Sequence, residues 1–333
     1  MRLLIAASFM TVLLLGSCTQ EENSPDTPQT GIGFSAVAPK ASRAASTTTA
    51  SLQKFIVYAY TESSILMDGV TVSREGGSWT YSPTVYWPGT AVNFYAISPD
   101  IRSDVPENTD GSHTIRGMSY GSTDLIYAVS LNQHERPTPV NLLFRHAMSK
   151  VAVMLSSTNS KYNIKVYHVL LKNIFLKGDF SLPDESTNNA TAEGIWNNLN
   201  LKSDAMIFYD HGTSISLTST PIDVTSGNLE ASFFVPQPLD AFNFTNSGQF
   251  SGGYIQVDCE IIDKATGNKI WPSEYTPEYL LVEDSPCGKM LFPRLSWNQG
   301  YSYIYNIIIN NSYVLDTIEF QPGVVDFTEE QPY

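Results

Sequence analysis

The residues able to do acid–base, nucleophilic or metal chemistry are scattered along the chain. The five histidines are at positions 113, 134, 146, 168 and 211, and no two have the spacing of a zinc site. The segments "GSTDL" (121–125) and "DSPCG" (284–288) lack the flanking pattern of a nucleophile elbow. No carboxylate is framed by apolar runs that would raise its pKa for acid catalysis. We therefore predict no enzymatic activity, metal or cofactor, and only a pair that converges in the fold stays open.

One thiol has a context that does predict chemistry. Residues 1–17 combine a basic residue, Arg2, with an apolar run too short to span a bilayer, which is typical of a secretory signal peptide. The run ends in "LGSC" (15–18), which resembles the lipobox of bacterial lipoproteins. In that family signal peptidase II cuts before the cysteine, and the cysteine carries the lipid, including palmitate. We expect Cys18 to be the lipidated first residue of the mature chain. An ordinary signal peptide with an incidental cysteine is the alternative.

The residues after Cys18 predict a tether. Residues 18–31 are rich in Glu, Asn, Pro and Gln, too polar to bury a core, so we expect them to be disordered. Glu21 and Glu22 resemble the signal that displays lipoproteins of the Bacteroidetes type on the outer face of the outer membrane. The expected location is therefore the cell outer membrane, with the protein exposed at the surface.

A single arginine marks a candidate processing site. The segment "PKASRAASTTTAS" (39–51) is small, polar and accessible, and it contains Arg43 followed by Ala44. A cut between these two residues would separate a short apolar strand, "GIGFSAVA" (31–38), from the rest of the chain. The alternatives are that Arg43 is a solvated loop residue, or that Arg74 in "VSREGG" is cut, which is less favoured.

Composition limits the partners. The chain has 333 residues, of which 42% are apolar, enough for a substantial core and two domains. Its net charge of −14 argues against binding to nucleic acid or to anionic lipid by electrostatics.

In "YIQVDCEIID" (254–263), Cys259 alternates with apolar residues, which predicts a buried free thiol; a disulfide to Cys287 is the alternative.

From Ile32 onward the chain is a series of short alternating or β-branched runs, separated by turn residues. This pattern is typical of an all-β sandwich. The stretch 132–140 is the best candidate for a linker and predicts domains at 32–138 and 139–333. The expected strands include 55–60, 92–97, 150–155, 164–171, 231–235, 254–262 and 303–309.

The aromatic residues are expected to pack in these sandwiches. The segment "WTYSPTVYWPGTAVNFYAISP" (79–99) contains Trp79 and Trp87 in a hairpin-like arrangement. Such residues are more often core and sheet-face residues than a platform for sugars. His146 and Lys150, in "VNLLFRHAMSKVAVML" (140–155), are expected to cap or bridge strand ends.

Together these segments resemble the fimbrillin family of Bacteroidetes fimbrial subunits. The resemblance is carried by the lipobox, by "RAASTTTASLQKFIVYAYT" (43–61), by the segments 79–99 and 140–155, and by "LSWNQGYSYIYNIII" (295–309). Members of that family consist of two tandem transthyretin-like β-sandwiches. They are exported as lipoproteins, processed by a protease and polymerised into fimbriae.

The resemblance implies a route of assembly. In the family the first strand is cut away after an arginine, and a strand from the next subunit refills its groove. Here residues 31–38 would leave after a cut at Arg43, and the donor would come from "VLDTIEFQPGVVDF" (314–327). The implied partners are other fimbrial subunits and a host or bacterial surface receptor, and the role as shaft, tip or anchor stays open. A surface glycan-binding lipoprotein is the rival interpretation, and a secreted hydrolase is disfavoured.

Overall fold

The computed structural model describes residues 29–38, 49–101, 113–209, 214–225, 233–238, 243–244, 250–293, 297–310 and 321–326. These residues form strands and their connections, with a short 3₁₀ helix, η2 (Glu278–Leu280). The predicted all-β fold is confirmed. Within these ranges no helix is long and apolar enough to cross a membrane.

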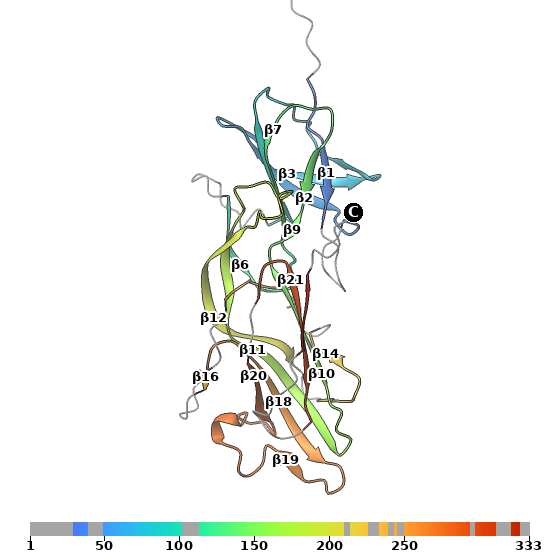
Figure 1. Ribbon diagram of the computed structural model, residues 1–333, viewed down its shortest axis with the longest axis vertical. Coiled ribbons are helices and arrows are strands. Elements are labelled where there is room, and N and C mark those ends of the chain that lie inside the picture. Colours follow the sequence, from blue (N-terminus) through green and yellow to red (C-terminus); the bar gives the residue numbers. More distant parts are fainter. Residues whose placement is uncertain are drawn as a thin grey trace, which may run out of the picture.

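The upper part of the molecule in Figure 1 is a sandwich built around one apolar core, here called the N-terminal sandwich. One layer is a six-stranded sheet, and the other is β1 (Phe34–Val37) paired in parallel with β8 (Val140–Leu143). In β2, Phe55, Val57 and Ala59 alternate into the core, as expected for a strand with one buried face. In sheet order the six strands are β4 (Ser78–Thr80), β3 (Ile65–Glu75), β2 (Lys54–Tyr60), β5 (Val92–Ser98), β7 (Ile126–Gln133) and β9 (Arg145–His146).

The lower part is a second sandwich, the C-terminal sandwich, with its own core. Its five-stranded sheet contains β10 (Ser149–Ser156), β14 (Ile222–Asp223), β15 (Phe233–Phe234), β21 (Tyr301–Ile308) and β22 (Gln321–Asp326). Its seven-stranded sheet contains β6 (Thr114–Ser119), β11 (Tyr162–Ser181), β12 (Ile195–Tyr209), β13 (Ile215–Ser216), β18 (Tyr254–Asp263), β19 (Lys269–Trp271) and β20 (Gly288–Pro293). A small separate pair consists of β16 (Asn243–Phe244) and β17 (Phe250–Ser251).

A third apolar cluster joins the two sandwiches. It contains Ile56 and Tyr127 from the N-terminal sandwich, and Phe180 and Phe233 from the C-terminal one. The indole of Trp196 adds a hydrogen bond to the carbonyl of Ala147, at 2.7 Å. Because the contact is apolar and buried, the sandwiches pack directly against each other.

Strand pairing crosses the predicted domain boundary between residues 138 and 139. After it, β8 and β9 pair with β1 and β7 of the N-terminal sandwich. Before it, β6 pairs with β11 of the C-terminal sandwich. The boundary and the transthyretin-like assignment stay predictions.

The strand directions define two opposite poles of the molecule. The chain passes from β8 through β9 into β10, so β8 runs toward the C-terminal sandwich, and β1, its parallel partner, runs the same way. Gly31 therefore lies at the pole away from the C-terminal sandwich. β21 runs parallel to β10, away from the N-terminal sandwich, and brings Asn310 to the opposite pole.

Candidate functional site: the first strand and its groove

The first strand is held by backbone hydrogen bonds on both sides. On one side the amide of Ile32 donates to the carbonyl of Val85, at 2.9 Å. On the other the amide of Val140 donates to the carbonyl of Gly33 at 2.8 Å, and a matching bond of 2.7 Å follows four residues later on each strand. The sequence placed residues 30 and 31 in the tether, but Thr30 also accepts a bond from Trp87, at 3.1 Å.

Alternate side chains of this segment enter the core of the N-terminal sandwich. Ile32, Phe34, Ala36 and Ala38 are buried, whereas Val37 is 44% exposed. The ring of Phe34 lies 5.6–6.2 Å from three other rings, those of Phe55, Tyr81 and Phe94. Removal of this strand would thus leave an aromatic-lined pocket at the Phe34 position, with smaller spaces beyond it.

Two polar side chains fix the ends of the segment, and neither could be identified from the sequence. The hydroxyl of Tyr81 donates to the carbonyl of Ile32, at 2.7 Å. Thr49 accepts from the amide of Ala38 at 3.0 Å and donates to its carbonyl at 2.7 Å. No local pattern identifies either residue, because each contact depends on where the chain returns.

The predicted processing site lies outside the described residues, as both Arg43 and Ala44 fall in the gap at 39–48. Arg74, the less favoured site, is part of β3. Its guanidinium donates to the carbonyl of Thr49 at 2.9 Å and lies 5.9 Å from the centre of the Trp79 ring. These contacts give Arg74 a structural role.

Cys18 also lies outside the described residues. The prediction of a buried free thiol at Cys259 is confirmed, and Cys287 is likewise buried and free. Burial raises the pKa of Cys287 to about 11, so this thiol is protonated at neutral pH.

Part of the predicted donor segment is already paired in this structure. Residues 321–326 form β22, which lies antiparallel to β21 at the edge of the five-stranded sheet. The rest of the segment, 314–320 and 327, lies outside the described residues.

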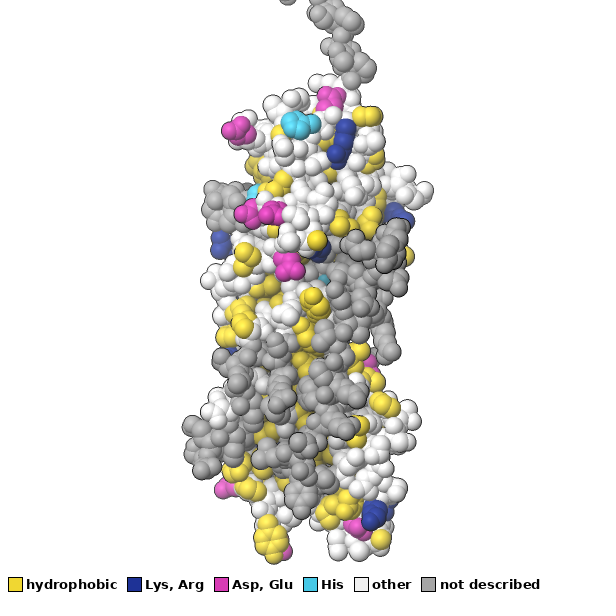
Figure 2. Space-filling view, viewed as in Figure 1, with side chains coloured by type: hydrophobic (Ala, Val, Ile, Leu, Met, Phe, Trp, Pro, Cys, Tyr) yellow, Lys and Arg dark blue, Asp and Glu magenta, His cyan; other side chains and the backbone are white. Residues whose placement is uncertain are grey.

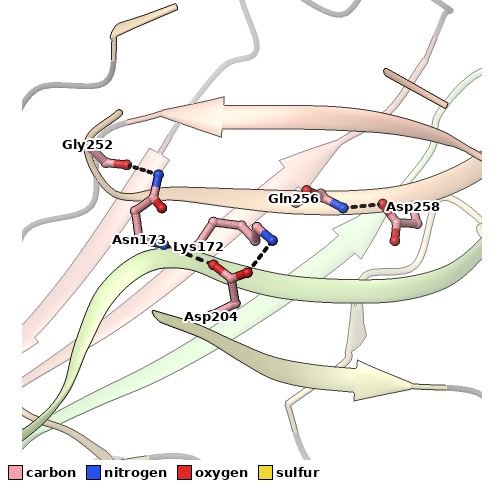
Figure 3. A network of polar contacts seen from close by, with 6 residues as sticks. All are labelled: Lys172, Asn173, Asp204, Gly252, Gln256 and Asp258. Atoms are coloured by element: carbon pink, nitrogen blue, oxygen red, sulfur yellow. Dashed lines mark hydrogen bonds and ion pairs between the residues drawn. The ribbon is translucent and has the colours of Figure 1, made fainter. Parts of the chain in front are cut away.

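A polar network lies on β18 and its neighbours (Figure 3). Lys172 and Asn173 of β11 contact the carboxylate of Asp204 on β12. Gln256 donates to the carboxylate of Asp258 at 2.7 Å, and His168 lies 3.2 Å from the same group. Burial raises the pKa of Asp258, although the bonds from Gln256 and His168 oppose this shift.

In this network each carboxylate contacts a residue of a neighbouring strand: Asp204 contacts Lys172, and Asp258 contacts His168. These contacts hold adjacent strands together, which is a structural role. The expectation that no carboxylate is framed by apolar residues is wrong for Asp258, which lies between Val257 and Cys259 in β18 and whose pKa is raised by burial. In the parts of the chain that the structure describes, no group of three His, Cys, Asp or Glu side chains could hold a metal ion. The absence of catalysis stays a prediction.

The two tryptophans of segment 79–99 belong to the core, as predicted. Trp87 is buried in the N-terminal sandwich, and Trp79 packs against the same core, with its ring 4.8 Å from that of Phe55. The segment is not a hairpin, because β4 pairs with β3, and β5 pairs with β2 and β7. Trp87 is therefore closed to a sugar, whereas Trp79 is half-buried against the core.

Comparison with known proteins gives a family match and structural neighbours. The profile of the fimbrillin-like family matches residues 42–324, well over half of the chain. No curated protein matches the chain. A fimbrial protein from Bacteroides vulgatus is 13% identical, with a TM-score of 0.50, and the match covers 90% of this chain and 99% of that chain.

Two further solved structures are similar over the same extent. A candidate cell adhesion protein from Bacteroides ovatus is 15% identical, with a TM-score of 0.47 and coverage of 91% of this chain and 99% of that chain. The tip fimbrial protein Mfa3 from Porphyromonas gingivalis, with a C-terminal truncation, is 13% identical, with a TM-score of 0.38 and coverage of 90% and 100%. At these identities the likeness concerns the fold alone.

Proposed function

The chain belongs to the fimbrillin-like family, and from this we propose that it is a subunit of a cell-surface fimbrium, exported as a lipoprotein and assembled by strand exchange. The observation that carries the proposal is the placement of β1. It fills the core of the N-terminal sandwich, yet it is joined to the next described residue, Thr49, only through the segment that contains Arg43. One cut there leaves β1 bound by noncovalent contacts alone.

The groove under β1 determines which kind of strand can replace β1. A donor must supply an extended backbone, inward apolar groups at alternate positions and an aromatic ring at the position of Phe34. Without a donor, the backbone groups that bond to β1 would be unpaired, at about 1–3 kcal/mol for each buried group.

The C-terminal segment of the chain repeats this pattern. "IEFQPGV" (318–324) aligns with "IGFSAVA" (32–38), with Ile318 at the position of Ile32 and Phe320 at that of Phe34. Pro322 and Val324 take the two alanine positions, where the groove must widen. The intervening residues Glu319, Gln321 and Gly323 take the outward positions. This alignment supports residues 318–324 as the donor, inserted in the same direction as β1.

The proline in this donor is compatible with the groove. The carbonyls of Gly33 and Val37 accept bonds from β8, so the odd-numbered positions of the segment face β8. Pro322 aligns with Ala36, an even-numbered position whose amide points away from β8. A missing amide hydrogen there costs no bond to β8.

Asn310 and Gly31 lie at opposite poles of the molecule, and this arrangement allows the donor to enter the groove in the direction of β1. β21 runs toward the pole at Asn310, and the groove opens at the opposite pole, at Gly31. In a head-to-tail stack, a segment that continues from Asn310 would enter the next groove at Gly31 and run toward Ala38. Because donor and groove lie on different surfaces, such contacts form a fibre instead of closing into a dimer.

The donor has a competing site in its own subunit. Residues 321–326 pair with β21 as β22, so this pairing must open before exchange. The free energy lost when β22 separates from β21 offsets part of the free energy gained when the donor fills the groove. We therefore expect exchange to be slow until β1 has left.

The proposal is tested with an arginine-specific protease. Wild-type protein cut at Arg43 should form fibres visible by electron microscopy and elute early in size-exclusion chromatography. The Arg43→Ala protein should stay monomeric. If the wild type is fully cut at Arg43 and stays monomeric, strand exchange at this site is wrong.

The donor register is tested separately. Phe320→Ala should abolish fibre formation by the cut protein, because the aromatic pocket stays empty. Gln321→Ala, one residue later and facing outward, is the matched control and should assemble normally. Equal assembly of the two variants would show that another segment is the donor.

A further inference from the structure

The connection between β19 and β20 concentrates exposed apolar side chains at the pole of the C-terminal sandwich. Among the described residues, eight large hydrophobic side chains are exposed, and three lie in this connection: Tyr275 (85%), Tyr279 (36%) and Leu281 (37%). Figure 1 places the connection, in orange, at the lower end of the molecule, and Figure 2 shows hydrophobic side chains gathered at that end beside acidic ones. We call residues 272–287 the polar-end loop, because they lie at this pole of the molecule; the name does not refer to polar side chains.

This loop is anchored from both sides. Leu280, in η2, is buried in the core of the C-terminal sandwich. Lys269 and Lys289 donate from their ammonium groups to the carbonyls of Pro286 and Tyr279, at 3.1 and 3.3 Å. The tyrosine side chains are thus presented from a fixed backbone, so they lose little conformational freedom when a partner binds.

The length of the donor arm determines what can contact this loop. Ile318 follows Asn310 by eight residues, which span at most about 26 Å at roughly 3.3 Å per residue. Asn310 binds the turn after β10, with its side chain accepting from the amide of Thr158 at 2.8 Å, and that turn bonds to residue 264 after β18. The root of the arm and the polar-end loop therefore share one pole.

The mouth of the acceptor groove offers a complementary surface. Gly31 is bridged to the exposed Tyr86 on one side, and Gly33 lies against Pro139 on the other. The connection that ends at Pro139 carries His134, Glu135 and Arg136. The polar-end loop has four carboxylates, Glu274, Glu278, Glu283 and Asp284, and no basic residue. Tyrosines and carboxylates can face a tyrosine and an arginine across such a contact.

We propose that the polar-end loop is a second contact between subunits, in which Tyr275 and Tyr279 of the donor pack against the groove mouth of a second copy of this chain, around Tyr86 and Arg136. This inference rests on the proposed strand exchange. It adds a surface that a donor strand alone lacks, so a whole subunit binds the groove more tightly than its isolated strand does.

The test compares two donors on one acceptor. The acceptor is wild-type protein cut at Arg43 and immobilised at low density. The donors are a synthetic peptide of residues 311–327 and the whole uncut chain, and dissociation constants are measured by biolayer interferometry. A whole-chain donor with Tyr275→Ala and Tyr279→Ala should bind about tenfold or more weakly than the wild type. Ile65→Ala, which removes a side chain that is 63% exposed on the other sandwich, should leave whole-chain binding unchanged.

A reciprocal change separates the loop contact from the strand. Tyr86→Ala in the acceptor should weaken binding of the whole chain more than binding of the peptide. If the whole chain binds and the double tyrosine variant binds equally well, the loop contact is wrong while strand exchange stands. If neither the peptide nor the whole chain binds, the proposed strand exchange itself fails. Loss of binding to an oligosaccharide array with unchanged assembly would assign the loop to glycans and overturn the inference.

Discussion

Phe34 concentrates the stabilising contacts of the first strand in one side chain. We expect Phe34→Ala to lower the free energy of unfolding of the uncut protein by about 3–5 kcal/mol, because it empties a pocket bounded by three rings. Denaturant unfolding measures the change. Val37→Ala, three residues later and facing outward, should change it by no more than about 0.5 kcal/mol. Equal effects from the two variants would mean that β1 contributes little to the core.

Glu260 should make the stability of the C-terminal sandwich depend on pH in the acid range. Burial disfavours its charge, but bonds from Tyr167, Lys165 and Lys269 outweigh burial and hold its pKa below the ordinary value. A carboxyl with a lowered pKa in the folded state stabilises the fold above its unfolded pKa, and this contribution is lost as the pH falls through its folded pKa.

We therefore expect the melting temperature to fall below about pH 4.5. Scanning calorimetry from pH 3 to pH 6 measures it. Glu260→Gln should flatten this part of the profile, whereas Glu283→Gln, on the exposed polar-end loop, should not. A Glu260→Gln profile that matches the wild type would contradict the assignment.

At the scale of elements, the junction between the sandwiches depends on a close approach at Gly194. A Cβ atom there would lie 2.2 Å from the ring of Phe180 and 2.8 Å from the carbonyl of Ser181. Gly194→Ala should cost about 1–3 kcal/mol by displacing Phe180 from the joining cluster. Thermal unfolding, with the exposed neighbour Glu193→Ala as control, tests this. An unchanged midpoint would mean that the junction can adapt.

Strands with regular alternation could be predicted from the sequence. The expected strands at 55–60, 92–97, 150–155 and 254–262 correspond closely to β2, β5, β10 and β18. β11 is much longer than the expected 164–171, because its register shifts against β12 and β18 break the alternation. At 231–235 the described pairing is limited to β15, which has two residues.

The partners of each strand could not be predicted. β1 and β8 are separated by more than 100 residues, and nothing in either sequence specifies parallel pairing. The bonds of Tyr81 and Thr49 to the first segment depend on that pairing. The same limit applies to Asp258 and Glu260, whose partners lie on other strands. Alternation tells which face of a strand is buried, but not which strand covers it.

At the scale of the whole molecule, the proposed lipid attachment site, Cys18, and the first strand both precede Arg43 in the chain. We expect Cys18→Ala to move the protein out of the membrane fraction, because the acyl chains supply its anchoring. Fractionation and immunoblotting measure this, with Thr19→Ala as control. Retention of the Cys18→Ala protein in the membrane would contradict the lipoprotein assignment.

A cut at Arg43 alone should not free the subunit. The lipidated fragment would still carry β1 and remain bound in the groove. We expect protein cut on membranes at low surface density, where donors from other subunits are scarce, to stay in the membrane fraction until the peptide 311–327 is added and displaces β1. A peptide with Phe320→Ala is the control. Release on cutting, before any peptide is present, would mean that β1 is not held after proteolysis.

The parallel pairing of β1 with β8 also has a mechanical consequence. A donor that replaces β1 in the same direction would lie along the axis of a head-to-tail fibre, with its ladder to β8 beside it. Tension on such a fibre would load the hydrogen bonds of the ladder together, in shear, and would not open them one after another as in peeling. The ring at the Phe34 position would act as a stop against sliding. A fibre with this joint would resist a steady pull far better than the equilibrium affinity of one short strand suggests.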